Sequence, residues 1–344
     1  MGKFNRILLL ALVCFASLLV LSACQLFGET GSLDGGYASA VVALGGADDY
    51  DDEATRDLEA AQIPLTRAPA IPNVIMPVAS GRLVERNSKA LIDHSNTVDG
   101  YVMVRWLANT NMQLRVQVVG PSETTYTYTI FPNESYEVFP LSDGNGSYTI
   151  NVFEQVEGSR YALATGLTIN VNMADEFAPF LRPNQFVNFD EDSKTVMKAA
   201  ELVSRDDGFL DKIAAVYAFV MRHLSYDTAF ANEVISGQHK GYVPVLDSVL
   251  DRGKGICFDY AALMTAMLRS QSIPTKLVIG YAGDVKHAWI SVFSEETGWV
   301  DQVIFFDGKN WLFMDPTFAS AASSASALQE FIGDGSIYNE THLY

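Results

Sequence analysis

Cysteine is scarce in this chain, and its scarcity excludes several classes of protein. The 344 residues include only Cys14, Cys24 and Cys257. A framework of several disulfides is therefore excluded, and so are zinc sites built from four cysteines. The five histidines lack paired spacings such as His-Glu-x-x-His, and no glycine-rich loop that could cradle a phosphate is present. We predict neither a metal nor a cofactor.

Basic residues are also few. The chain has 23 Lys and Arg against 41 Asp and Glu, which gives a formal net charge of -18. Nucleic-acid binding requires clustered basic side chains, so we expect no nucleic-acid partner. The negative charge would attract basic protein substrates, although such a charge is more often related to solubility. Internal repeats of solenoid period are absent as well.

The first residues have the features of an export signal. Lys3 and Arg6 precede an apolar run from residue 7 to 21, which ends in Leu21-Ser22-Ala23-Cys24. This ending resembles the lipobox of bacterial lipoproteins, in which the chain is cut before the cysteine and the thiol is lipidated, for example with palmitate. The resemblance implies a signal peptide over 1–23 and a lipid anchor on the extracytoplasmic face of the cell membrane. A transmembrane anchor or an ordinary secretory signal is the alternative.

Lipidation would leave the mature protein with a single free thiol. Cys14 would leave with the signal and Cys24 would carry lipid, so Cys257 would have no partner for an intramolecular disulfide. In an oxidising compartment a lone thiol is a liability unless it has a function or is well buried. The residues around Cys257 must therefore distinguish these two cases.

A flexible tether is predicted over residues 24–88. This stretch is rich in Gly, Ala and Asp, and it contains an acidic run over 48–53 and several prolines. Such a tether would hold the folded part away from the lipid headgroups. A low-complexity stretch without that role is the alternative interpretation.

Residues 89–172 have the pattern of a small antiparallel β-sandwich. Short runs rich in β-branched and aromatic residues alternate with period two and are separated by turn-forming residues. We expect a spacer or a packing partner for the next domain, with glycan or protein binding as the alternative. The clearest predicted strands are 101–106, 113–118, 125–130 and 147–152.

The period becomes helical in residues 173–344, which we predict to be an α+β domain. An apolar stripe from Phe209 to Leu224 predicts one helix with its face in the core, and a second helix should begin near Gly255 and continue through Leu268. A meander of antiparallel strands is expected to follow. The predicted strands are 275–281, 288–293, 302–306 and 311–314.

Three residues of this domain have the side chains that thiol acyl transfer needs. Cys257 lies at the predicted start of the second helix, where free N–H groups and the helix dipole stabilise a thiolate. His287 lies at the start of one predicted strand and Asp315 just after another, so strand ends could place both beside the helix start. A histidine would move the proton and a carboxylate would orient it. The glycines before Cys257 would allow substrate close to the backbone.

These residues occur in three ordered blocks, which resemble the transglutaminase-like superfamily. That family has Gly-x-Cys-x-(Asp/Glu)-(Tyr/Phe)-Ala, then His-Ala-Trp, then Asp-Pro-Thr. The stretches 224–227 and 268–281 also look like connections in the family. The resemblance implies a papain-type core of helices and an antiparallel sheet. In this chain the blocks are Gly255-Ile256-Cys257-Phe258-Asp259-Tyr260-Ala261, His287-Ala288-Trp289 and Asp315-Pro316-Thr317.

The resemblance also implies a reaction. Cys257 would attack a carboxamide or peptide carbonyl of a protein or peptide substrate, with His287 as base and acid and Asp315 orienting it. The resulting thioester would give crosslinking, deamidation or peptide hydrolysis, and the motifs do not choose among them. A non-catalytic surface binding or scaffold module, using the β-sandwich and an inactive domain of this fold, is the alternative function.

Four further residues receive tentative roles in this scheme. The Cys257 backbone N–H would contribute to an oxyanion hole, with Gln238 or Tyr242 as candidates for a second donor. Trp289 would either shield the catalytic pair from water or simply pack on its strand. Asp259 would either cap the helix or contact substrate, and we favour the cap. The sequence does not indicate an oligomeric state.

Overall fold

The computed structural model describes residues 68–344 except 134, 296–297, 302, 307–310 and 314–337. The chain divides into compact units at 1–60 and 61–344, and all described residues belong to the second unit. The predicted signal peptide, Cys24 and most of the predicted tether therefore lie outside the described residues. Within the described part, no helix is long and apolar enough to cross a membrane.

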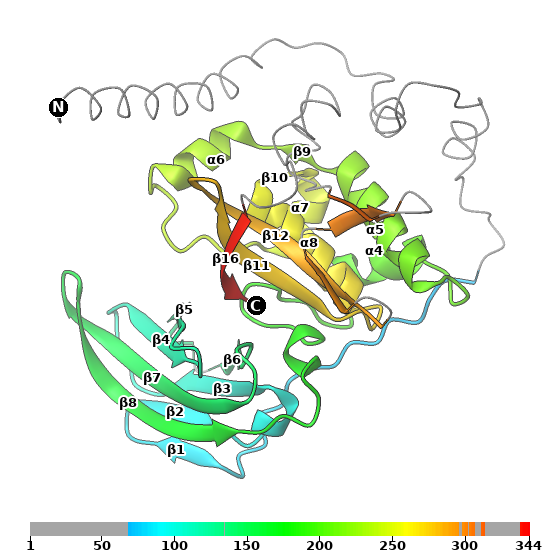
Figure 1. Cartoon of the computed structure of the whole chain (residues 1–344). Helices are drawn as coiled ribbons and strands as arrows, with labels where there is room; N and C mark the ends of the chain where they lie inside the picture. The colour runs from blue at the N-terminus through cyan, green and yellow to red at the C-terminus, as the bar shows by residue number, and fades with distance from the viewer. Residues whose placement is uncertain (1–67, 134, 296–297, 302, 307–310, 314–337) are drawn as a thin grey trace, which may run out of the picture. The chain divides into compact units, whose positions relative to one another are not determined.

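Two four-stranded antiparallel sheets occupy residues 84–171, with strand orders β1-β2-β3-β6 and β5-β4-β7-β8. Figure 1 shows β7 and β8 as a long hairpin. Predicted strands 101–106 and 125–130 agree with β3 and β5 to the residue. The strands are β1 (Val84–Arg86), β2 (Ala90–Asp93), β3 (Tyr101–Trp106), β4 (Leu114–Val119), β5 (Thr125–Ile130), β6 (Glu137–Pro140), β7 (Gly146–Glu157) and β8 (Arg160–Val171).

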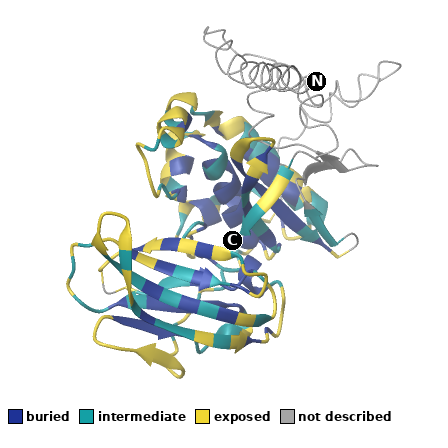
Figure 2. Cartoon of the chain, turned by 60° about the vertical axis from the view of Figure 1, so that its left-hand side comes forward, coloured by how far each residue is buried: buried dark blue, intermediate teal, exposed yellow. Residues whose placement is uncertain are grey.

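Period-two alternation builds the core of this β region. Strand β5 reads Thr-Tyr-Thr-Tyr-Thr-Ile, and its tyrosines and isoleucine are buried while its threonines are exposed. Figure 2 shows the same alternation of buried and exposed positions along the strands. Trp106, Tyr148 and Phe139 are among the other large side chains that are fully buried here. A strand that packs one face against a core has apolar residues at alternate positions. The sequence alone therefore predicted these strands.

Helices and a second group of strands follow, so the α+β prediction is confirmed. A four-stranded antiparallel sheet has the order β13-β12-β11-β16, β14 pairs with β15, and β9 pairs in parallel with β10. The helices are α4 (Lys194–Leu202), α5 (Phe209–His223), α6 (Thr228–Ile235), α7 (Leu246–Arg252) and α8 (Cys257–Arg269). The strands are β9 (Ser225–Tyr226), β10 (Lys254–Gly255), β11 (Thr275–Ala282), β12 (Val285–Ser294), β13 (Gly298–Asp301), β14 (Val303–Phe306), β15 (Trp311–Phe313) and β16 (Tyr338–Leu343).

Both predicted helices are present. On α5 the predicted stripe is buried from Ile213 to Val220, whereas Phe209 and Leu210 at its start are only half-buried. Helices α4, α6 and α7 and strands β13 and β16 were not predicted. Helices α6 and α7 have only 8 and 7 residues, too few turns for a clear period. One signal was present, because Asp227 caps α6 by accepting the Phe230 N–H at 3.0 Å.

Helix α8 is the centre of this second region. Every residue from Asp259 to Arg269 is buried, and the helix packs against α4, α5 and α7 and against strands β11 and β12. Figure 1 shows α8 beside β11 and β12. A helix that is apolar on all sides must be enclosed on all sides. This burial explains why its interior consists almost entirely of Ala, Leu and Met.

Arg269, in the last turn of α8, is fully buried and binds main-chain oxygen atoms. Its Nε donates to the Thr275 oxygen at 2.9 Å, Nη1 to the Arg182 oxygen at 2.6 Å and Nη2 to the Tyr344 oxygen at 2.6 Å. Burial lowers the pKa of Arg269 to about 9, so the group still carries charge at neutral pH. One side chain thus links the helix to three separate segments.

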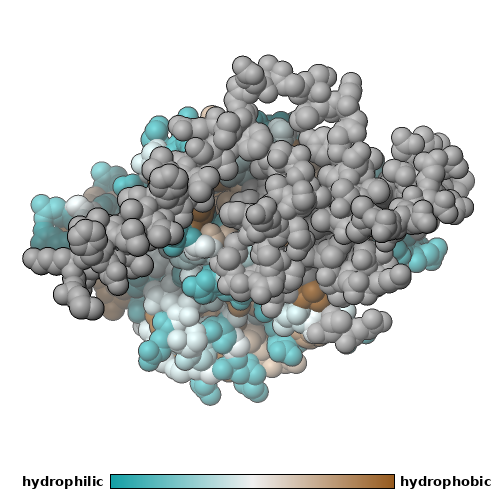
Figure 3. Space-filling model, turned by 45° about the horizontal axis from the view of Figure 1, so that its top comes forward, coloured by the Kyte–Doolittle hydropathy of each residue, from teal (hydrophilic) through white to brown (hydrophobic). Residues whose placement is uncertain are grey.

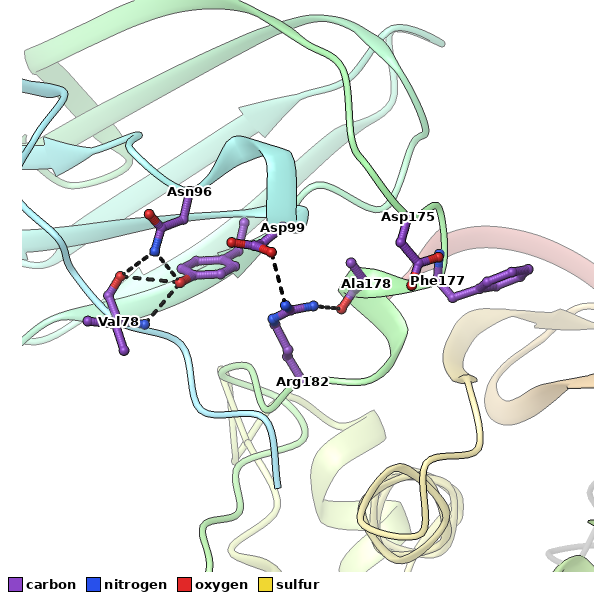
Figure 4. Close-up of polar contacts among 8 residues, drawn as sticks. Val78, Asn96, Asp99, Asp175, Phe177, Ala178 and Arg182 are labelled. Atoms are coloured by element: carbon purple, nitrogen blue, oxygen red, sulfur yellow. Dashed lines mark hydrogen bonds and ion pairs between the residues drawn. The ribbon is translucent and has the colours of Figure 1, made fainter. Parts of the chain in front are cut away.

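Polar and aromatic contacts join this region to the β sheets. Arg182 donates to the Ala178 carbonyl at 2.8 Å and to Asp99 at 3.3 Å (Figure 4). The Ser142 hydroxyl donates to the Leu343 carbonyl at 2.6 Å. Near this bond, four aromatic rings pack against one another, either edge to face or stacked. They belong to Tyr126, Tyr128, Phe186 and Tyr344. The segment after β16 therefore contacts both regions.

We expect Arg269→Met to lower the free energy of unfolding by about 2–4 kcal/mol, because three main-chain oxygen atoms lose their charged donor. Urea denaturation of the purified full chain measures the change. Arg222→Met, at an exposed position in the last turn of α5, removes the same charge and should have little effect. Equal stability of the two variants would contradict the structural role of Arg269.

Candidate functional site

Cys257 is the first residue of α8 and is half-buried, with a free thiol. Ile256 before it has an extended backbone, with φ -103° and ψ 176°, so the chain turns into the helix at Cys257. The first N–H groups of a helix have no carbonyl of their own turn to bind. The thiol therefore lies at the end of α8 where backbone donors and the positive end of the dipole are found.

Asp259 caps this helix start, as predicted. Its Oδ2 accepts the Ile256 N–H at 2.8 Å. Only one half of a capping box forms here, because the Ile256 side chain has no atom that could accept the Asp259 N–H. Asp259 thus binds the N–H group before the helix and leaves those of Cys257 and Phe258 for other partners.

Two further side chains hold the Asp259 carboxylate from outside the helix. The Tyr242 hydroxyl donates to Oδ1 at 2.5 Å, and Nη2 of Arg252 donates to the same oxygen at 3.1 Å. Asp259 is fully buried, and burial raises its pKa, while hydrogen bonds from Tyr242, Ile256 and Arg252 partly oppose that rise. The result is a buried carboxylate with three donors, two residues from Cys257.

The chain before Cys257 is fixed by a short parallel pair of strands. Lys254 and Gly255 of β10 pair with Ser225 and Tyr226 of β9, and the Asp227 N–H donates to the Gly255 carbonyl at 2.8 Å. From within α8, the Tyr260 hydroxyl donates to the Leu224 carbonyl at 2.9 Å. The stretch 224–227 therefore has an evident structural role.

Gly255 has a packing role that was not predicted. A Cβ atom there would lie 2.5 Å from the Asp259 Cβ. Real Cβ atoms do not approach so closely, so any larger residue would displace the capping side chain. The expected close approach of substrate to this glycine stays a prediction.

His287 is the third residue of β12, and its side chain is almost entirely buried. Its ring stacks near that of Trp289, with centroids 6.0 Å apart, because alternate residues of a strand share a face. The Tyr338 ring of β16 lies 6.2 Å from the same histidine. Helix α8, which begins with Cys257, packs against the strand that carries His287.

Trp289 is a packing residue in this structure. It is 2 % exposed and meets the Tyr338 ring edge to face at 5.1 Å. A Cβ atom at Gly280, on the neighbouring strand β11, would collide with the Asn339 main-chain oxygen and lie 2.6 Å from the indole ring, so the glycine makes room for both. These contacts support the packing interpretation, and a shielding role remains a prediction.

The other predicted site residues have varied surroundings. Asp315 and Cys24 lie outside the described residues. Gln238 is exposed after α6, and its Nε2 donates to the Ser236 hydroxyl at 3.1 Å. The Tyr242 hydroxyl has one hydrogen, and it donates that hydrogen to Asp259. The oxyanion roles of Gln238 and Tyr242 stay predictions.

Arg252 is the residue near Cys257 that sequence reasoning missed. It belongs to α7, a helix that was not predicted, and its approach to Asp259 depends on the turn between α7 and α8. A basic residue in the last turn before a glycine is common in helices, so no local pattern indicated this contact. Only the packed structure reveals it.

Two hollows in the described surface, of about 140 Å³ and 270 Å³, are lined by neither Cys257 nor His287. Hydrophobic residues are scattered over a largely hydrophilic to neutral surface where Figure 3 shows described atoms. Among the described residues, no group of three His, Cys, Asp or Glu side chains could hold a metal ion.

Comparison with known proteins finds one family model that matches this region. Residues 197–316 match the model of the transglutaminase-like superfamily, and the match confirms the resemblance seen in the three sequence blocks. It spans the positions of Cys257, His287 and Asp315. No curated protein matches the chain.

Three solved structures are similar at low identity. A candidate cysteine protease from Cytophaga hutchinsonii is 13% identical with TM-score 0.35, covering 69% of this chain and 72% of its own. Red sea bream transglutaminase is 10% identical with TM-score 0.25, covering 71% of this chain and 55% of its own. A candidate protease from Parabacteroides distasonis is 11% identical with TM-score 0.25, covering 62% and 63%. These low scores mean that the likeness is loose.

Gly255→Ala should lower the free energy of unfolding by about 1–3 kcal/mol, because the added methyl group collides with the Asp259 side chain. Thermal and urea unfolding of the full chain measure the loss. Gly208→Ala is the matched control, since a Cβ atom there meets only an Asp211 oxygen at 3.3 Å. If both substitutions are tolerated equally, the Gly255 contact does not constrain the helix start.

Proposed function

We propose that the transglutaminase-like region is a thiol enzyme that attacks a carboxamide or peptide carbonyl, with Cys257 as nucleophile, His287 as general base and acid, and Asp315 orienting the histidine. The observation that carries the proposal is the position of Cys257. The only free thiol of the described residues is the half-buried first residue of an otherwise enclosed helix. The superfamily match includes this residue and both partner positions.

The proposed chemistry begins with proton transfer from the Cys257 thiol to His287. The thiolate then attacks the carbonyl carbon, and the oxygen takes the negative charge beside the N–H groups of the first turn of α8. His287 returns the proton to the leaving nitrogen, so ammonia or an amine departs and a thioester remains. An incoming amine or water molecule loses its proton to His287 and attacks that thioester, which releases the product and restores the thiol.

The second attack determines the outcome. A lysine amine would give a crosslink, while water would give deamidation or peptide hydrolysis. We propose a protein or peptide as the substrate, because the acyl group in each case is a carboxamide or a peptide carbonyl. The described residues around Cys257 favour none of these outcomes over the others.

We further propose that Cys24 carries lipid and that the enzyme acts on the extracytoplasmic face of the membrane. The support is the sequence Leu21-Ser22-Ala23-Cys24 after a short apolar run with a basic start. In this arrangement the β region would lie between the tether and the thiol domain along the chain. It would act as a spacer or packing partner.

Cys257 should react rapidly with iodoacetamide below a pH of about 8, where an ordinary thiol is mostly protonated, and His287→Ala should slow this reaction by about tenfold or more. Alkylation rates of the purified full chain over pH of about 5 to 9 measure both effects. His94→Ala, in the β region, is the matched control and should leave the rate unchanged.

Turnover provides the second readout of the same proposal. Cys257→Ala should abolish amine incorporation into, ammonia release from, or cleavage of glutamine-containing peptides. Unchanged turnover in this variant would refute the proposal. Slow alkylation in both the parent chain and His287→Ala would instead support a non-catalytic binding module.

Cys24→Ser should prevent lipidation and release the protein from the membrane fraction, because the proposed acceptor thiol is lost. Labelling cells with radioactive palmitate, followed by fractionation, measures both effects. Cys14→Ser, within the predicted signal, should keep the label. A labelled, membrane-bound Cys24→Ser protein would show that the anchor lies elsewhere.

A further inference from the structure

The buried carboxylate of Asp259 is unusual for its position. It lies two residues after Cys257 in the first turn of α8, and it is fully buried. A buried carboxylate is costly unless several donors surround it. Only one of its three donors, the Ile256 N–H, belongs to the helix start, and the other two come from Tyr242 and Arg252.

The geometry of the cap fixes the backbone around the thiol. Asp259 holds the Ile256 N–H at 2.8 Å, so the peptide between Gly255 and Ile256, one residue before Cys257, has a defined orientation. Tyr242 and Arg252 in turn prevent the carboxylate from rotating away. Arg252 is itself fixed, because its Nε donates to the Lys254 carbonyl at 2.6 Å and its Nη2 to the Tyr242 hydroxyl at 3.1 Å.

The charges of Asp259 and Arg252 also affect the reactivity of the Cys257 thiol. A buried negative carboxylate two residues from Cys257 opposes the formation of a negative thiolate, because solvent screens a buried charge poorly. Arg252 places a positive charge on that carboxylate at 3.1 Å and offsets it. Among the described residues, Lys254 also pairs with Asp227 on this connection, at 3.3 Å. The sheet that packs against α8 carries His287 on β12, which is the other titratable group of the proposed reaction.

We propose that Tyr242 and Arg252 are positioning residues that act on Cys257 through Asp259: they fix the cap and neutralise its charge, so that the thiolate forms readily. The catalytic consequence depends on the proposed function. The effect on thiol reactivity does not, because alkylation requires a thiol and no turnover.

The test measures iodoacetamide alkylation of Cys257 in the full chain as a function of pH. Arg252→Gln should move the half-maximal rate upward by about one pH unit and slow the reaction at neutral pH about tenfold, since the carboxylate loses its counter-charge. Arg252→Lys keeps the charge and should restore most of the rate. Arg222→Gln removes an equal charge from an exposed position and should leave the profile unchanged.

A double-mutant cycle separates charge from folding. Asp259→Asn keeps an acceptor for the Ile256 N–H but removes the negative charge, so Arg252→Gln should no longer shift the profile in that background. Tyr242→Phe is nearly isosteric and should slow alkylation by about threefold or more through loss of one charge-assisted bond. It remains informative if Asp259→Asn fails to fold.

Unchanged profiles in folded Arg252→Gln and Tyr242→Phe would overturn the inference. An equal shift with and without Asp259→Asn would also overturn it, because the effect would then bypass the carboxylate. Failure of the proposed function has a different signature, namely no peptide turnover and no response to His287→Ala. The response to Arg252→Gln can be measured in either case.

Discussion

The enclosure of α8 is the constraint on which the rest of this structure depends. From Asp259 to Arg269 the helix has no exposed residue, so every polar group on it must find a partner inside the protein. Its two buried charges lie at opposite ends. Asp259 at the start binds Tyr242 and Arg252, and Arg269 at the end binds three main-chain oxygen atoms. The hydrogen bonds of these two buried charged side chains therefore hold the neighbouring segments in place.

This enclosure also determines where chemistry is possible. Cys257 and Phe258, in the first turn, are the only residues of α8 that are half-buried, and the rest are sealed. A thiol one turn further along the helix would be fully buried and inaccessible to substrate. At the first position it lies beside the first N–H groups of the helix, which are the kind of donor that a thiolate or an oxyanion requires. The proposed nucleophile therefore lies in the one turn of α8 that neighbouring segments do not bury completely.

The segment from Tyr338 to Tyr344 connects features that are distant in sequence. Tyr338 packs against Trp289 and lies near His287, while Tyr344 accepts a hydrogen bond from Arg269. The Tyr344 ring also joins the aromatic group that includes Tyr126 and Tyr128 of the β region. The histidine strand, the end of α8 and the β region therefore share one strand as a common neighbour.

By itself the sequence determined the α+β class, the β strands with strict alternation, helix α5, a helix with Cys257 in its first turn and the cap by Asp259. Each of these depends on local periodicity or on contacts within one turn, which neighbouring residues encode directly. Only the tertiary structure decided that Gly255 makes room for Asp259, that Arg252 and Tyr242 hold that carboxylate, and that Tyr344 reaches Arg269. These contacts join residues on separate elements, and they form only when burial of α8 brings those elements together.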